Sequence, residues 1–273
     1  MPRFATGILF AALGVTRLAG HDYWIEPGRL AGAPGDTVPL RVFVGEKLKA
    51  EEERPYEAGR TVRWEALSAA GRQDLREGAA DGVTPAGQLR LAGPGTHLVV
   101  LERLPALITI AADRFTDYLR EEGLGAIIAA RAKNGESGKP GRERYQRFLK
   151  SYVRADGGPE AVVPAATLRL DLAPGFRKDR GPRVGDRVWV RVTFDGQPLA
   201  RTTIFAEARL PDGGISRGVA TDADGWAEIE LNAPGLWVVR LVHMRRAPAG
   251  DRQADWESFW GACSFGVAEN PAS

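Results

Sequence analysis

The stretches PGDTVPLRVFVGEKL (34–48) and VGDRVWVRVTFDGQPL (184–199) are two copies of one pattern, a Gly-Asp pair followed by alternating apolar residues and a turn. Each copy is followed by a second shared segment, LAGPGTHLVVLE (91–102) in the first and LNAPGLWVVRLV (231–242) in the second. In both of these segments a Pro-Gly turn precedes a strand that is apolar on both faces. A repeat of this kind indicates two domains of similar fold.

The alternation of apolar and other residues predicts half-buried β-strands, because successive side chains of a strand point to opposite faces. Turn sequences such as Pro94-Gly95, Asp195-Gly196 and Asp224-Gly225 recur between these segments. Short strands separated by frequent turns are typical of β-sandwiches. We therefore expect a mainly β protein with two β-sandwich domains, immunoglobulin-like or transthyretin-like in strand pattern.

Between the two copies the spacing of apolar residues becomes helical. In 113–135, Asp113 is a suitable N-cap, and Phe115, Tyr118 and Leu119 fall on one helix face. A second apolar stripe in 136–153 also predicts a helix. Its members are Tyr145, Phe148, Leu149 and Tyr152. We therefore expect an α-helical insertion between the sandwiches.

The first twenty residues, MPRFATGILFAALGVTRLAG, have the pattern of a secretory signal peptide. One early charge, Arg3, precedes an uncharged run, and small residues end the segment at Ala19 and Gly20. The run is too short for a membrane span, which needs ~20 apolar residues. We therefore expect an exported, periplasmic protein that is cleaved near Gly20 and has no membrane span afterwards.

These patterns predict four parts of the chain. Their bounds are 1–20 for the signal peptide, 21–112 for the N-terminal sandwich, 113–156 for the helical insertion and 165–268 for the C-terminal sandwich. A polar linker at 154–165 is expected to lead into the last part.

Composition excludes several classes of function. The 37 basic and 35 acidic residues leave a net charge of +2, so nothing favours nucleic-acid binding. The single cysteine, Cys263, excludes an internal disulfide, and its apolar surroundings in sequence predict a buried, unreactive thiol. The chain has no Gly-x-Ser-x-Gly elbow and no GxGxxG after a predicted strand, so we do not expect an enzyme.

Cleavage of the signal peptide would place a histidine at or near the new N-terminus. A cut after Gly20 leaves His21 first, with its α-amine and imidazole free to chelate one metal ion. A cut after Leu18 leaves Ala19-Gly20-His21, and a histidine in third place is a known chelate for copper(II) and nickel(II). The alternative is that His21 is an ordinary polar residue before the first strand.

The chain has three histidines, so any site rich in imidazole must use these. They would converge only if the two sandwiches pack with the relevant strand ends together, in an interdomain cleft. With nearby carboxylates, the expected metal ligands are His21, His97, His243, Asp22, Glu26 and Glu257. Mixed nitrogen and oxygen donors suit nickel, copper or cobalt. The alternative is that the two later histidines are ordinary strand residues.

Two pairs of tryptophans receive different predictions. Trp189 and Trp237 lie on alternating strands and are expected in the core, where most sandwich tryptophans lie. Trp24 and Trp256 lie near the two ends of the mature chain and are expected to form the wall of a site.

Several segments resemble a family of exported bacterial proteins, the domain of unknown function 4198, formerly named a nickel-uptake substrate-specific component. They are HDYWIEP (21–27), ADRFTDYLREEGLGAIIAARAKNG (112–135), PGRERYQRF (140–148) and DWESFWGACSFGV (255–267). The segment 140–148 is the most specific part of the likeness. The resemblance implies export, β-rich domains and an association with nickel and cobalt uptake, with membrane components of metal uptake as partners.

Three hypotheses of function follow. The first is an exported metal-binding accessory to nickel, cobalt or copper uptake or trafficking. The second is an envelope scaffold or adhesion module that binds no metal, which the repeat and its strand pattern favour. The third is a copper-dependent oxidase with an N-terminal histidine brace, by analogy with oxidative polysaccharide-cleaving enzymes that are also β-sandwiches.

Overall fold

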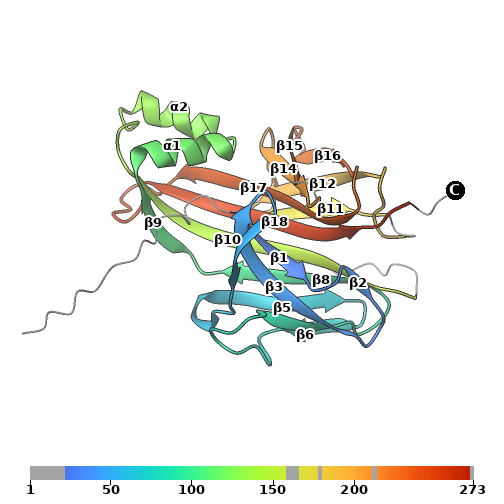
Figure 1. Cartoon of the computed structure of the whole chain (residues 1–273). Coiled ribbons are helices and arrows are strands. Elements are labelled where there is room, and N and C mark those ends of the chain that lie inside the picture. Colours follow the sequence, from blue (N-terminus) through green and yellow to red (C-terminus); the bar gives the residue numbers. More distant parts are fainter. Residues whose placement is uncertain (1–21, 158–165, 178–179, 211–213, 271–273) are drawn as a thin grey trace, which may run out of the picture.

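The computed structural model describes residues 22–157, 166–177, 180–210 and 214–270, and these residues form three β-sheets and two α-helices (Figure 1). The prediction of a mainly β protein with two sandwiches and a helical insertion is confirmed for this part of the chain. His21, the signal-peptide segment and the predicted linker residues 158–165 lie outside it.

The largest sheet, called the central sheet below, has ten strands. They are β2 (Ala31–Gly32), β5 (Thr61–Ser68), β6 (Gly71–Asp74), β8 (Gly95–Arg103), β9 (Ala106–Ile110), β10 (Gly141–Ala155), β14 (Thr203–Ala208), β15 (Ile215–Ala220), β17 (Gly235–Arg246) and β18 (Trp256–Val267). Their order is β15-β14-β17-β18-β10-β8-β5-β6, and β2 and β9 also pair with β10.

Two four-stranded sheets pack on the central sheet. The first small sheet contains β1 (Asp22–Pro27), β3 (Thr37–Glu46), β4 (Lys49–Arg54) and β7 (Gly87–Arg90). The second small sheet contains β11 (Leu170–Gly175), β12 (Arg187–Phe194), β13 (Gln197–Pro198) and β16 (Trp226–Glu230). The helices are α1 (Ala112–Glu121) and α2 (Gly125–Lys133), and a short 3₁₀ turn covers Ala58–Arg60.

The sequence repeat corresponds to equivalent strands of the two sandwiches. The Gly-Asp segments form β3 and β12, which are the middle strands of the two small sheets. The Pro-Gly segments form β8 and β17, which lie in the two halves of the central sheet. Each sandwich therefore takes one layer from its own small sheet and the other from a sheet that both share.

The two halves of the central sheet meet at a parallel pair, β10 and β18, in register from Glu143 opposite Trp256 to Ser151 opposite Ser264. The strand order is mirrored about this pair, so the two halves are related by a twofold axis that runs along the strand direction. Rotation about such an axis exchanges the two faces of the sheet. Equivalent faces of the two halves therefore point in opposite directions, and the two small sheets pack on opposite sides.

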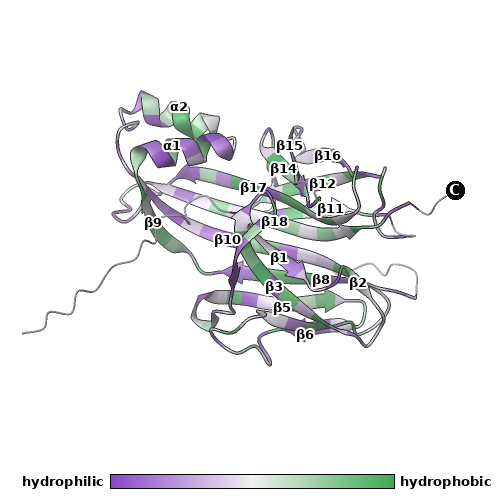
Figure 2. Ribbon diagram, in the orientation of Figure 1, coloured by the Kyte–Doolittle hydropathy of each residue, from purple (hydrophilic) through white to green (hydrophobic). Residues whose placement is uncertain are grey.

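Alternating residues of the central strands confirm this arrangement. Val99 and Leu149 belong to the buried cluster that contains Trp24 of β1. Their chain neighbours Val100 and Phe148 belong to the cluster of the second small sheet. The central strands carry apolar residues toward both faces, because each face is covered over part of its length. Figure 2 shows apolar residues in green along these strands, between more polar ones.

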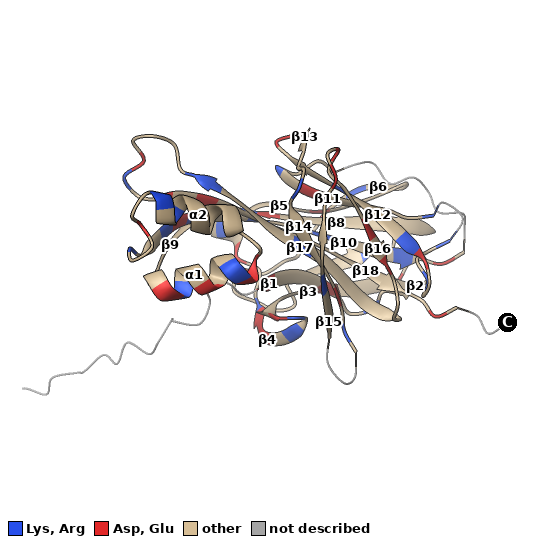
Figure 3. Ribbon diagram, turned by 90° about the horizontal axis from the view of Figure 1, so that it is seen from above, with Lys and Arg blue, Asp and Glu red and all other residues tan. Residues whose placement is uncertain are grey.

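The helices cover the remaining length of the face that carries the first small sheet. Phe115, Tyr118 and Leu119 of α1 are buried, as the spacing predicts, and they pack with Val242 and Trp256 of the central sheet. Asp113 lies in the first turn and does not cap it, since Ala111 is the N-cap residue. Acidic and basic residues follow one another along α1 (Figure 3).

The prediction of a second helix over 136–153 is wrong, because Gly141–Ala155 is β10, a central strand of the shared sheet. Its backbone pairs with β8 and β9 on one side and with β18 on the other. The helical stripe was fortuitous: residues 148, 149 and 152 are apolar because both faces of this strand are buried. Tertiary pairing therefore overrides the local pattern here.

Candidate functional site

The first small sheet and the helices lie side by side on one face of the central sheet, and a cavity lies at the border between them. Gly141 of β10 allows the helices to approach closely, since a Cβ there would lie 2.4 Å from Cγ of Phe115. The rings of Tyr118 and Trp260 stack at 5.5 Å with an interplanar angle of 8°, joining α1 to β18. The border is thus held by rigid aromatic packing.

The cavity has a volume of about 370 Å³ and draws its lining from β1, β4, β8, β9, α1, β10 and β18. We call it the arginine–tyrosine cavity. Its basic residues are Arg54, Arg60, Arg103 and Arg147, and its aromatic residues are Tyr23, Tyr118, Tyr145 and Trp260. Two carboxylates, Glu57 and Glu143, also line it, so arginines outnumber carboxylates.

Arg147 is the buried cation of this cavity, with 8% of its surface exposed. Its guanidinium carbon lies 3.8 Å from the ring centre of Tyr23 and 4.6 Å from that of Tyr145. Its Nε has no hydrogen-bond partner among the described residues. Arg103, by contrast, forms an ion pair with Glu57. Stacking therefore holds the Arg147 guanidinium in place without using its Nε–H donor.

Glu143 is the buried carboxyl of the cavity, with 1% of its surface exposed. Its Oε1 accepts hydrogen bonds from the hydroxyls of Ser258 and, at 3.4 Å, Tyr118, while within the described ranges its Oε2 has no partner. Burial raises the pKa of Glu143 to about 7, although Ser258, Trp260, Arg147 and Tyr118 act in the opposite direction. Near neutral pH this carboxyl is therefore protonated in part of the molecules.

A second polar cluster lies on the same face, around Arg240 of β17. Arg240 pairs with Asp22 of β1 at 2.8 Å, with Glu122 after α1 at 2.7 Å and with Glu207 of β14 at 3.1 Å. All three carboxylates are buried, and Oε2 of Glu207 has no partner in the described part of the chain. One guanidinium thus faces three carboxyls. We call these residues the Arg240 cluster.

Burial and mutual repulsion govern the titration of the Arg240 cluster. Burial raises the pKa of Asp22 well above its ordinary range, and Glu207 and Glu122 raise it further, against the lowering effect of Arg240. Burial also raises the pKa of Glu122. A small hollow lined by Asp22, Tyr23, Arg240 and Trp260 adjoins the arginine–tyrosine cavity, since Tyr23 and Trp260 line both.

The other predicted carboxylate ligands lie elsewhere and are held by arginines. Glu26 accepts hydrogen bonds from Nη1 and Nη2 of Arg209, both at 2.7 Å. Glu257 pairs with Arg245 at 2.8 Å on the opposite face of the central sheet. Of the predicted carboxylates, only Asp22 lies in a cluster of acidic side chains.

His97 and His243 do not come together. His97 lies on the face of the first small sheet, where its Nε2 accepts from the amide of Ala92 at 3.1 Å and burial lowers its pKa. His243 lies on the other face, 4.5 Å from the ring centre of Phe194, and burial lowers its pKa as well. Measured parallel to the strands, the two residues are offset by on the order of 23 Å, at about 3.3 Å per residue.

In the described ranges no group of three or more His, Cys, Asp or Glu side chains is placed to hold a metal ion. His21 lies outside these ranges. The predicted metal site therefore stays a prediction. Asp22, which follows His21 in the chain, is the first residue that the structure describes.

The predictions for tryptophans and Cys263 had mixed outcomes. Trp237 and Cys263 are buried as expected, and burial raises the pKa of the thiol to about 12. Trp189, expected in the core, is 50% exposed. Trp24 and Trp256, expected at a site wall, are fully buried in the cores beneath the first small sheet and the helices.

Sequence reasoning did not identify Glu143, Arg147, Glu207 or Arg240 as site residues. A signal was present in 140–148, where Glu143, Tyr145 and Arg147 alternate with residues of the other face. In a helix these three side chains would point in different directions around the helix axis. Read with period 2, they share one face of a strand.

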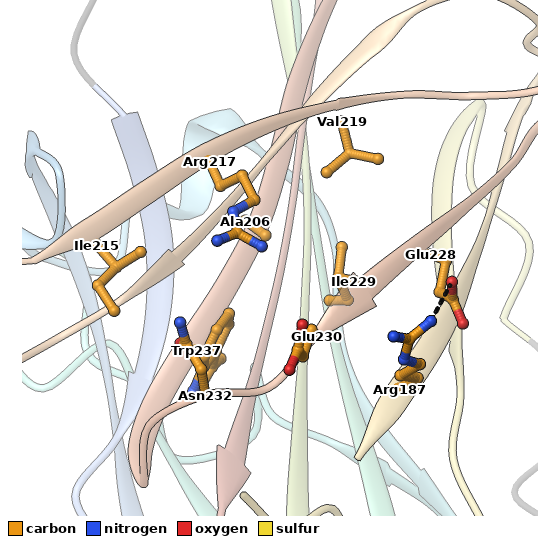
Figure 4. Close-up of a pocket in the computed structure, with 10 residues that line it drawn as sticks. All are labelled: Arg187, Ala206, Ile215, Arg217, Val219, Glu228, Ile229, Glu230, Asn232 and Trp237. Atoms are coloured by element: carbon orange, nitrogen blue, oxygen red, sulfur yellow. Dashed lines mark hydrogen bonds and ion pairs between the residues drawn. The ribbon is translucent and has the colours of Figure 1, made fainter. Parts of the chain in front are cut away.

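A smaller hollow of about 160 Å³ lies at the open edge of the second sandwich, between β15 and β16 (Figure 4). Arg187 turns toward Glu228 there, at 3.3 Å, and both side chains are substantially exposed. Ile229 and Trp237 form part of its lining. This hollow is less than half the volume of the arginine–tyrosine cavity, and its Arg187 and Glu228 already pair with one another, so it offers less to a ligand.

The family model described as "Domain of unknown function (DUF4198)" matches residues 18–245. The chain belongs to this family. The match spans the first sandwich, the helices and most of the second sandwich, and both the arginine–tyrosine cavity and the Arg240 cluster lie almost entirely within it. No curated protein matches the chain. In the described part of this DUF4198 protein, no helix has the length and apolarity needed to cross a membrane.

Proposed function

We propose that this DUF4198 protein is exported, is cleaved near Gly20, and binds a transition metal at its N-terminal segment as an accessory to metal uptake or trafficking. Nickel or cobalt is the first expectation for the metal and copper the second. The partners would be membrane components of metal uptake.

The observation that supports this proposal is the Arg240 cluster. Asp22, the chain neighbour of His21, lies among buried carboxyls that a single guanidinium cannot neutralise. An additional cation beside Asp22 would stabilise the ionised carboxylates, because unpaired buried charges are costly. A free α-amine and imidazole at His21 would add the nitrogen donors that nickel and copper prefer.

The donors in this region fit such an ion in kind. Asp22 and Glu207 offer carboxylate oxygens, and Oε2 of Glu207 is unpartnered in the described ranges. His97 and His243 are too far apart to join one site, so we confine the proposal to His21 and Asp22, with Glu207 near by.

Mass spectrometry of the chain purified from the cell envelope, without chelators, tests both parts of the proposal. The denatured mass identifies the N-terminus, and the native mass reports bound metal. We expect a chain that begins at His21 or Ala19 and carries one nickel, cobalt or copper ion. A chain that begins elsewhere and stays free of metal after incubation with each ion contradicts the proposal and leaves the scaffold hypothesis in front.

Titration calorimetry with nickel chloride then locates the site. His21→Ala and Asp22→Asn are expected to weaken nickel binding at least tenfold, while His243→Ala is the matched control and leaves it unchanged. Equal loss in the control would contradict a site confined to His21 and Asp22. Copper-dependent turnover with a reductant would instead favour the oxidase hypothesis.

A further inference from the structure

The arginine–tyrosine cavity contains two buried polar groups that the described protein leaves incomplete. Among the described residues, Nε of Arg147 and Oε2 of Glu143 have no hydrogen-bond partner, although both side chains are more than nine-tenths buried. Buried polar atoms in folded proteins nearly always find partners. The side chains that carry these two atoms line one cavity of about 370 Å³, which points to a polar ligand that completes them.

The charge of the cavity selects an anion. Glu57 is already engaged by Arg103, and Arg54 pairs with Glu52 at 2.6 Å, so these groups largely neutralise one another. Arg60 and Arg147 form no such pair in the described ranges and face the same space. The planar donor fork of arginine matches a carboxylate, and stacking on Tyr23 and Tyr145 already fixes the fork of Arg147.

The remaining wall of the cavity selects an apolar, planar body. Leu104 lines it and is 47% exposed, and Ile108 and Ile110, which share the face of Glu143, form the same wall. Trp260 and Tyr118 complete it. A small inorganic anion would leave this apolar surface in water, whereas an aromatic ring would cover it.

We propose that the arginine–tyrosine cavity binds an aromatic carboxylate, with the carboxylate on Arg147 and the ring against the wall formed by Ile108 and Ile110. A hydroxyl beside the carboxylate would reach Glu143 and complete its second oxygen. The site needs no metal and does not depend on the metal proposal, although the two regions adjoin at Tyr23 and Trp260.

Titration calorimetry of the whole purified chain tests the proposal with four probes: salicylate, benzoate, benzyl alcohol and inorganic phosphate. We expect saturable binding of salicylate and benzoate, with salicylate the tighter, and at least tenfold weaker binding of benzyl alcohol and of phosphate. Tighter binding of phosphate than of benzoate would overturn the aromatic part. Equal binding of benzyl alcohol, or no saturation with any probe, would overturn the site as an anion site.

Two variants locate the binding. Arg147→Gln is expected to weaken salicylate binding at least tenfold, and Arg187→Gln, at an exposed arginine of the second sandwich, is the matched control. Ile108→Glu keeps the proposal testable if the first variant does not fold, because Ile108 is only partly buried, shares the face of Glu143, and a carboxylate there repels the ligand. Unchanged affinity in a folded Arg147→Gln or Ile108→Glu protein contradicts the proposal.

Addition of nickel chloride separates the two proposals. If both hold, salicylate binds with and without nickel, and His21→Ala abolishes nickel binding while leaving salicylate binding in place. Salicylate binding that requires nickel in the wild type, and is lost in His21→Ala, would overturn the assignment of the ligand to Arg147.

Discussion

The two faces of β10 each carry a buried cation, and the two cations differ in their partners. Lys150, on the face of the second small sheet, is 3% exposed and forms an ion pair with Asp171 of β11. Arg147, on the face shared by the first small sheet and the helices, is 8% exposed and its Nε has no partner in the described ranges. One face is complete within the protein, and the other has capacity left for a ligand.

The difference follows from what covers each face. The second small sheet covers its face of the central strands with one continuous apolar cluster, which includes Cys263 and Phe265. The opposite face is divided between the first small sheet and the helices, whose apolar clusters are separate. Charged groups collect at the border between two covers. The comparison teaches that the incomplete border, and not the repeat itself, makes the site.

The largest expected effect is at the Arg240 cluster, on the divided face. Arg240→Leu leaves Asp22, Glu122 and Glu207 buried without their cation, and we expect the free energy of unfolding at pH 7 to fall by roughly 3–5 kcal/mol. Urea unfolding followed by circular dichroism measures it. Arg187→Leu, at an exposed pair, is the control and should change stability by less than about 1 kcal/mol. A loss below about 1 kcal/mol in Arg240→Leu would show that the three carboxyls become protonated, and so lose their charge, when Arg240 is absent.

The next effect compares the two cations of β10 directly. Lys150→Met leaves the partly buried carboxyl of Asp171 without its cation, so we expect a loss of roughly 3 kcal/mol, most of which Lys150→Met/Asp171→Leu recovers. Arg147→Gln breaks no such pair and should cost about 1 kcal/mol or less in the absence of ligand. Equal losses in the two single variants would break the comparison between a complete and an incomplete face.

Glu143 should make the divided face sensitive to pH. Its pKa of about 7 in the folded protein lies above its ordinary value of 4.5, so the folded state keeps a proton that the unfolded chain releases within this window. Stability therefore falls as pH rises through the window, by about 2 kcal/mol between pH 5 and pH 8. Glu143→Gln should reduce the fall by about this amount when thermal or urea unfolding is measured across that range, while the other buried carboxyls with raised pKa, such as Asp22 and Glu122, leave a residual fall. An identical pH profile in wild type and variant would place the titration elsewhere.

The smallest effect concerns how each cover approaches the central sheet. Gly141→Ala on β10 forces a Cβ against the rigid ring of Phe115, at 2.4 Å from its Cγ, and we expect a loss of about 1–2 kcal/mol. Gly261→Ala on β18 meets the flexible end of Leu172 at 2.5 Å, on the opposite face, and should cost less. Urea midpoints of the two variants provide the measurement. A larger loss in Gly261→Ala would mean that the helices yield more easily than the second small sheet.

The sequence by itself determined the strands of the repeat and the first helix. In β3 and β12 the apolar residues alternate because one face of each strand is buried, and in α1 the spacing of Phe115, Tyr118 and Leu119 identifies the buried face. Both are local patterns, and a local pattern survives in any tertiary context that buries one face. The resemblance to the DUF4198 family could also be recognised from the sequence segments that carry it.

Only the tertiary structure decided that residues 141–155 form a strand rather than a helix, and only it formed the site that contains this strand. A strand buried on both faces carries no clean period, so its neighbours β8, β9 and β18 determine its conformation through backbone hydrogen bonds. The parallel pairing of β10 with β18 then places the two small sheets on opposite faces and separates His97 from His243. It also brings Arg147, Tyr23 and Trp260 together from strands far apart in the sequence, which no local pattern can specify because the contacts depend on pairing and register.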